Sequence, residues 1–141
     1  YCNGDNLCYA TEDRMPEPIR FWKTAYDNGW FARLSIVDKS VSSVVGTVEL
    51  CLRVSEDDFN GMGILRVDVR SDYEREDFLY ELFSLLTPAL EETLGCKGAL
   101  TKAPLYAVDR INAIRRAGFT KSEHRLIAGS GDAYDGYWTV P

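Results

Sequence analysis

The sequence predicts a single α/β domain over residues 1–141, with a mixed, mostly antiparallel sheet, a central β-α-β crossover and helices on both faces. Two observations lead to this fold class. Short segments in which apolar and polar side chains alternate stand before and after longer segments with helical periodicity. In addition, 45% of the 141 residues are hydrophobic and 27% are charged, which is typical of one soluble domain with its own core.

The first part of the chain predicts one helix and two paired strands. Residues 18–29 carry apolar side chains at helical spacing and end in Asp-Asn-Gly, a sequence that stops helices. Segments 30–38 and 44–54 are dense in apolar and β-branched residues. The short polar turn between them predicts an antiparallel hairpin.

The middle of the chain predicts a strand that leads directly into a long helix. Residues 64–70 alternate strictly between apolar and charged side chains, and residues 73–94 carry a broad apolar stripe at helical spacing. Gly95 is a natural helix end. Because Pro88 lies inside the stripe, the sequence predicts either a kink or a break into two helices there.

The last part predicts a strand at 96–103, a helix at 104–118 and two closing strands at 119–129 and 133–141. The final strand is aromatic. Three roles remain open for its rings, which are core packing, a homodimer contact and the wall of an acceptor pocket, with the first two favoured for Tyr134, Tyr137 and Trp138.

Composition narrows the class of partner. The formal net charge of −6 and the pI of about 4.8 argue against nucleic acid, because phosphate binding needs a basic face. No apolar run reaches the roughly 18–20 residues of a membrane span. The first ten residues also lack the basic and apolar regions of a signal peptide, so we expect a cytoplasmic protein.

The four cysteines predict no metal site. Cys2, Cys8, Cys51 and Cys96 form no Cys-x-x-Cys pair and match no common zinc spacing. We expect free thiols in a reducing compartment, with a Cys2–Cys8 disulfide as the alternative.

The segment VDVRSDYEREDFLYELFSLL, residues 67–86, contains a strand-to-helix turn at which a phosphate group could bind. A strand that turns into a helix presents unpaired N–H groups, which favour phosphate. This turn contains no glycine and carries the acids Glu74, Glu76 and Asp77. Acids at a helix start also stabilise the helix dipole by about 0.3–1 kcal/mol each, without any ligand.

Three segments resemble the GNAT family of N-acetyltransferases. They are VVGTVEL at 44–50, LRVDVRSDYERED at 65–77 and INAIRRAGF at 111–119. The resemblance covers about residues 18–141. Within the family, the sequence is most similar to the branch that includes the ribosomal-protein N-terminal acetyltransferases. The family's first strand and first helix are not visible; they would lie upstream of Tyr1 or be replaced by residues 1–17.

The resemblance implies acetyl-CoA as cosubstrate and direct transfer of the acetyl group to a primary amine in a ternary complex. It also implies that the cofactor-binding residues are the main-chain groups of one strand and the side chains of the following turn, namely Val67, Val69, Arg70, Arg75, Glu76 and Asp77. A small-molecule or peptide amine is the expected acceptor, and the acidic net charge suits a cationic one.

The sequence departs from the family pattern at the cofactor positions. The basic first position of the phosphate turn is Glu74, and its two glycines are Asp77 and Leu79. Ala107 and Ile114 stand where the family often has an asparagine and a tyrosine. The alternative is therefore a GNAT-fold binding or regulatory module that has lost CoA; binding of a different donor is a further alternative.

The candidate catalytic residues are few. Glu49 and Asp68 are candidate bases on neighbouring strands, and Tyr106 is a candidate acid. For the two carboxylates, the alternative is an ordinary solvent-facing strand position; for Tyr106 it is packing at a helix start. Arg110, Arg115 and Arg116 form a basic patch on the last helix, which we expect to be a solvated helix face.

Overall fold

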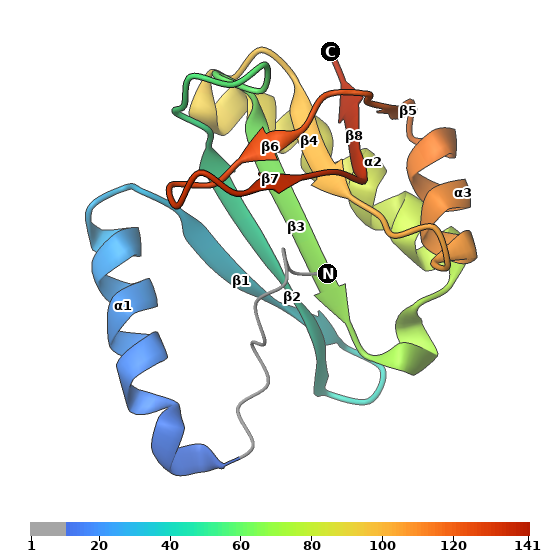
Figure 1. Ribbon diagram of the computed structural model, residues 1–141. Helices are drawn as coiled ribbons and strands as arrows, with labels where there is room; N and C mark the ends of the chain where they lie inside the picture. Colours follow the sequence, from blue (N-terminus) through green and yellow to red (C-terminus); the bar gives the residue numbers. More distant parts are fainter. Residues whose placement is uncertain (1–10) are drawn as a thin grey trace.

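The computed structural model describes residues 11–141 (Figure 1). The helices are α1 (Pro16–Asp27), α2 (Glu76–Leu94) and α3 (Val108–Arg116), with short 3-10 turns η1 (Glu12–Arg14) and η2 (Ser71–Tyr73). The strands are β1 (Ala32–Asp38), β2 (Ser43–Leu52), β3 (Gly63–Val69), β4 (Ala99–Lys102), β5 (Thr120–Lys121), β6 (Leu126–Ile127), β7 (Ala133–Tyr134) and β8 (Tyr137–Val140).

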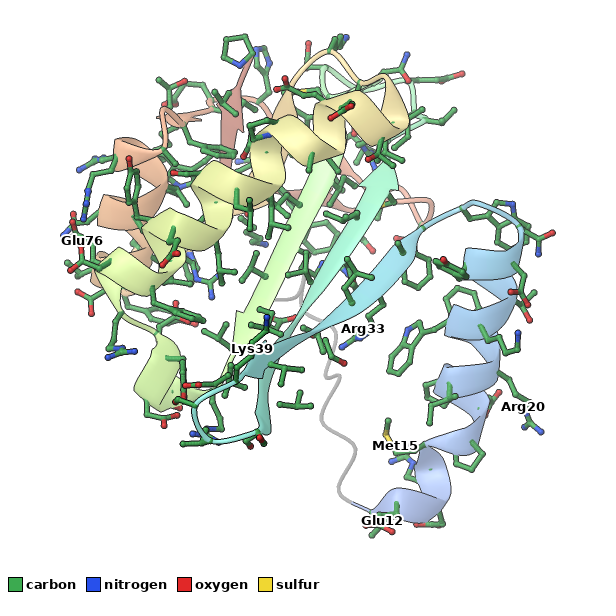
Figure 2. All side chains as sticks on the ribbon, turned by 180° about the vertical axis from the view of Figure 1, so that it is seen from behind. Glu12, Met15, Arg20, Arg33, Lys39 and Glu76 are labelled. Atoms are coloured by element: carbon green, nitrogen blue, oxygen red, sulfur yellow. The ribbon has the colours of Figure 1, made fainter. Side chains whose placement is uncertain are left out.

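Six strands form one mixed sheet in the order β1-β2-β3-β4-β8-β5, and β6 and β7 form a separate hairpin. Only β3 and β4 run parallel, with α2 as their crossover; the other pairs are antiparallel. Helices α2 and α3 cover one face, while α1 stands beside β1 toward the other face (Figures 1 and 2). The predicted fold class is confirmed.

The main core lies between the sheet and the pair α2 and α3. Its fully buried members include Leu65 and Val67 of β3, Leu79 and Phe83 of α2, and Ile114 of α3. Alternation along the strand explains why the even-numbered residues of β3 face the opposite side. There a smaller cluster forms, consisting of Phe59, Met62, Leu100, Leu126 and Tyr137.

The aromatic end of the chain is mainly core. Tyr137 is 5% exposed and Trp138 is 3% exposed, and they belong to the two different clusters. Core packing is therefore confirmed for these two rings. The ring of Tyr134 is only partly buried against the smaller cluster.

Several elements differ in detail from the sequence predictions; the strand predicted at 133–141, for example, is the two strands β7 and β8. Of the kink and the break that the sequence left open at Pro88, the break is excluded, because α2 runs on through the proline: Phe83 before it and Leu90 after it are both fully buried, so the same core holds both halves. Helix α3 begins later than predicted, after a turn in which Ala107 N bonds Pro104 O at 2.9 Å. The strand predicted at 119–129 is two short strands, which pair with β8 and β7 respectively.

Cys51 and Cys96 are free thiols, whereas Cys2 and Cys8 lie outside the described residues. Within residues 11–141, no group of three or more His, Cys, Asp or Glu side chains gathers in a way that could hold a metal ion. The described helices include none that is long and apolar enough to cross a membrane.

Candidate functional site

The central feature of the site is a split between β3 and β4. These parallel strands pair only at Gly63–Ala99 and Ile64–Leu100, although β3 continues to Val69. In their remaining lengths no ladder joins the two strands. A gap that opens in the middle of a sheet leaves main-chain groups without a strand partner.

The edge that β3 turns toward the split is defined by its register with β2. Arg70 N bonds Val45 O at 2.8 Å, so every second residue of β3 counted back from Arg70 directs its N–H and C=O groups toward β2. The residues between them, which include Val67 and Val69, direct these groups toward β4. This is the orientation that the predicted main-chain contacts of Val67 and Val69 require.

Arg110 of α3 lies across this edge. Its side chain is 2% exposed, and its Nη1 donates to Val67 O at 2.8 Å. Its Nε and Nη2 donate to the two carboxylate oxygens of Glu74 at 2.6 and 2.8 Å. The prediction of a solvated helix face was therefore wrong for Arg110, which joins α3 to β3 and to the turn before α2.

The other acids of the turn are paired as well. Arg116 donates to Glu76 at 2.8 Å and to Asp77 at 2.7 Å, and Figure 2 shows Glu76 at the start of α2 beside α3. Sequence reasoning considered these acids and the arginines of α3 separately and missed their pairing. A usable signal was present, because oppositely charged clusters stood on the two helices that flank one parallel strand pair.

Arg70 and Arg75 gather around one ring. Arg70 pairs with Asp72 at 2.7 Å, and the guanidinium carbons of Arg70 and Arg75 lie 5.1 and 5.5 Å from the centre of the Tyr73 ring. Both side chains are exposed beside the start of α2. Four acids, at 72, 74, 76 and 77, thus lie beside four arginines, two of them next to the turn at 70 and 75 and two on α3 at 110 and 116.

Tyr73 fastens this turn to the β1–β2 hairpin. Its hydroxyl donates to Asp38 Oδ2 at 2.7 Å. Hydrogen bonds from Ser40 and then from Tyr73 lower the pKa of Asp38 to about 2, and the bond to Asp38 raises the pKa of Tyr73.

We expect an acid-dependent effect of Asp38→Asn. Because the folded pKa of Asp38 lies below its unfolded value of about 4, its contribution to the free energy of unfolding is present above pH 4. That contribution is lost as the pH falls toward about 2. Urea unfolding from pH 7 to pH 2 should show wild type and Asp38→Asn converging toward acid; a constant difference between them would contradict this.

A polar row crosses the sheet on the face toward α1. Arg33, Glu49 and Arg66 stand opposite one another on β1, β2 and β3. Glu49 accepts from Arg33 through one oxygen and from Arg66 Nη1 through the other at 2.6 Å. Trp22 of α1 covers Arg33 at 4.2 Å, and Figure 2 shows Arg33 pointing toward α1.

The three candidate catalytic residues differ in placement. Both oxygens of Glu49 accept hydrogen bonds from guanidinium groups, so its side chain is held between Arg33 and Arg66. Asp68 borders a cavity of about 480 Å³ together with Val69, Glu74 and Arg110. Tyr106 is 78% exposed and lines none of the cavities described here. Asp68 is thus the candidate that shares a cavity with Val69 and Arg110, which border the split.

Two further cavities lie on this face. One of about 1160 Å³ lies between α1 and the sheet, with Trp22, Glu49 and Cys51 in its wall; burial raises the pKa of the Cys51 thiol. A smaller one of about 240 Å³ reaches the split at Val67. Arg53, Ile64 and Arg66 line both, so the two form one continuous face.

Comparison with solved structures places the fold among acetyltransferases. A ribosomal-protein-S5-alanine acetyltransferase from Vibrio fischeri superposes with a TM-score of 0.71 at 12% identity, over 99% of this chain and 75% of that chain. A spermidine N-acetyltransferase from Vibrio cholerae, in complex with CoA and spermine, superposes with a TM-score of 0.65 at 12% identity, over 93% and 74% of the two chains.

A protein described as a GNAT-family acetyltransferase from Bordetella pertussis gives a TM-score of 0.66 at 14% identity, over 97% of this chain and 81% of that chain. No family model matches the sequence, and no curated protein matches it. At these identities the likeness concerns the fold. The chain therefore has the fold of the GNAT acetyltransferases.

Proposed function

We propose that this chain is an N-acetyltransferase that moves an acetyl group from acetyl-CoA to a primary amine by direct attack in a ternary complex. The observation that carries the proposal is the split at β3. The fold provides a strand edge whose main-chain groups at Val67 and Val69 point into an opening between parallel strands. An extended amide-containing arm is the kind of ligand that such an edge pairs with.

The residues at the start of α2 fit the phosphates of the cosubstrate. The first N–H groups of a helix have no helical partner and attract anions. The acids of the turn are directed to Arg110 and Arg116, so they do not face a phosphate unopposed. Arg70 and Arg75 add positive charge beside the turn.

The chain's own residues then have three tasks. The main chain of Val67 and Val69 holds and orients the arm, and the turn with Arg70 and Arg75 holds the phosphates. Asp68 takes the proton from the attacking amine, because it is the candidate carboxylate beside the split. Acetyl-CoA, when bound, supplies the activated acyl group, and no metal takes part in the proposal.

The acceptor enters, in this proposal, from the face between α1 and the sheet. The cavity there is large enough for a small molecule or for the end of a peptide. A cytoplasmic location also belongs to the proposal, since the free thiols of Cys51 and Cys96 suit a reducing compartment.

One observation favours a second candidate function, a binding or regulatory module without CoA. Arg110 already donates to Val67 O and is almost completely buried. An arm that uses this carbonyl group must displace a charged side chain that also holds Glu74. In the second candidate, the Arg110–Glu74 pair closes the cofactor position permanently.

A thermal-shift titration with acetyl-CoA, followed by calorimetry, separates the two functions. A ligand at a hundred times its Kd adds about 2.7 kcal/mol to the free energy of unfolding, which raises Tm by about 5–10 °C for a domain of this size. We expect a saturable rise. No rise at about 1 mM acetyl-CoA, a concentration that still detects weak binding, would support the module.

Matched arginine variants test where the cosubstrate binds. Arg75→Gln removes a charge at the start of α2, and Arg125→Gln removes a charge that is also exposed, before β6. We expect the first to weaken acetyl-CoA binding about tenfold, the usual weight of one charge-assisted hydrogen bond. The second should leave binding unchanged; equal effects would contradict the proposed phosphate position.

A further inference from the structure

Tyr73 contacts four side chains around the turn that leads into α2. The guanidinium groups of Arg70 and Arg75 lie over its ring, with their central carbons 5.1 and 5.5 Å from the ring centre. The ring of Phe78, in the first turn of α2, meets it edge-on with 5.3 Å between the ring centres. The Tyr73 hydroxyl donates to Asp38 Oδ2 at 2.7 Å. One half-buried side chain therefore connects both exposed arginines with α2 and with the β1–β2 hairpin.

The two arginines are held in different ways. Arg70 also pairs with Asp72 at 2.7 Å. Arg75 forms no ion pair within residues 11–141, and its guanidinium group lies over the Tyr73 ring. Both arginines lie within the range of about 6 Å in which a guanidinium group is attracted to the negative face of an aromatic ring. The ring therefore sets the position of the Arg75 charge, and it helps to set that of Arg70.

The ring itself is fixed at both ends. Asp38, which accepts from the hydroxyl, also accepts at its other oxygen from Ser40 N at 2.8 Å and from Ser40 Oγ at 2.6 Å. The carboxylate is thus anchored in the hairpin, 35 residues before Tyr73 in the chain. The edge-on contact with Phe78 adds a preferred orientation on the side of α2.

The fixed ring matters because of what begins beside it. Arg75 occupies the N-cap position of α2, and its side chain makes no capping hydrogen bond. Free N–H groups at a helix start and guanidinium groups both favour phosphate. A long arginine side chain loses conformational freedom when it binds an anion. A ring that already holds the arginine near the helix start lowers this loss, so binding becomes stronger.

We propose that Tyr73 is a positioning residue for phosphate recognition. Its ring holds Arg70 and Arg75 at the start of α2, and its bond to Asp38 holds the ring in place. The inference rests on the proposed function, because the phosphate groups are those of acetyl-CoA. Tyr73 touches no reacting atom, so a neutral side chain controls how strongly two neighbouring charges act.

The test measures acetyl-CoA binding by calorimetry at several salt concentrations. Tyr73→Leu removes the ring and should weaken binding about tenfold at about 50 mM NaCl, the weight of one charge-assisted hydrogen bond. At about 1 M NaCl, where charges are screened within about 3 Å, the affinities of wild type and variant should converge. A change that only loosens the fold would lower the affinity by the same factor at every salt concentration.

Three comparisons serve as controls. Tyr73→Phe keeps the ring and loses only the bond to Asp38, so we expect a loss of about threefold; this variant keeps the test decisive if Tyr73→Leu fails to fold. Tyr134→Leu removes another half-buried ring beside a cation, Lys102 Nζ at 5.6 Å, and should not change binding. In an Arg75→Gln background, Tyr73→Leu should weaken binding less than in wild type, because one of the two positioned charges is already absent.

The outcomes separate this inference from the proposed function. If the wild-type chain does not bind acetyl-CoA, both are overturned. If the wild-type chain binds it and either Tyr73 variant binds it equally well, the inference alone is overturned. A loss of the same size at low and high salt would also overturn it. A loss that salt removes, together with unchanged binding in Tyr134→Leu, supports the positioning role of Tyr73.

Discussion

Replacing Glu74 with alanine is expected to lower the free energy of unfolding by about 3 kcal/mol, the cost of removing one partner of a largely buried charge pair. The arginine side of the pair is 2% exposed and the glutamate side is 23% exposed. Arg110 cannot lose its proton. Chemical unfolding at pH 7 measures the change.

The two residues of the pair differ in burial, and this difference gives a sharper test. Arg110→Met replaces the buried charge with an apolar chain of similar length and leaves the carboxylate at the partly exposed position, so it should cost less than Glu74→Ala. The double variant Glu74→Gln with Arg110→Met should be closer to wild type than the sum of the single changes.

Glu81→Ala is the control for this series. Glu81 is exposed on α2, so its replacement should change stability by no more than about 0.5 kcal/mol. If Glu74→Ala also cost less than about 1 kcal/mol, the value of an exposed ion pair, solvent would be replacing the carboxylate. The pair would then not be what holds Arg110 against Val67 O.

The same variants connect stability with function. In the proposed enzyme, binding of acetyl-CoA along β3 requires Arg110 to leave Val67 O, so weakening the pair should strengthen cosubstrate binding relative to wild type. In the alternative module, opening the pair exposes a position that binds nothing. Calorimetry of acetyl-CoA binding to the Arg110→Met variant therefore distinguishes the two functions, in addition to the titration of the wild-type chain.

The arrangement of elements was predictable because periodicity reports burial. The alternation of residues 64–70 and the stripe of residues 73–94 correspond closely to β3 and α2, whose apolar faces meet in the main core. Local preference alone could not decide between a kink and a break at Pro88. Tertiary packing decides against the break, since buried side chains on both sides of the proline hold α2 together.

The site residues named from the sequence came mainly from the resemblance to the GNAT family. Val67 and Val69 were named in this way, and the register of β3 with β2 turns their main-chain groups toward the split. Arg110 could not, because its burial depends on side-chain contacts from two elements distant in sequence. The ion pairs of Glu49 likewise arise from the cross-strand register, which composition does not reveal.

Asp57→Asn is expected to lower the free energy of unfolding by about 3 kcal/mol, again because one partner of a buried pair is removed. The Asp57 side chain is 3% exposed and pairs with Arg53. It also accepts from Ser55 Oγ at 2.7 Å, Phe59 N at 3.1 Å and Ile127 N at 2.9 Å. This carboxylate therefore joins the loop before β3 to β6.

The neighbouring residue supplies the control, and pH supplies a second readout. Asp58→Asn should cost less than about 1 kcal/mol, since Asp58 is exposed and pairs only at the surface with His124. Hydrogen bonding from Arg53 holds the pKa of Asp57 well below its usual range. Its stabilising effect is therefore full above about pH 4 and declines in stronger acid, so wild type and Asp57→Asn should converge below that pH. Equal losses for the two asparagine variants would show that Asp57 does not hold β6 in place.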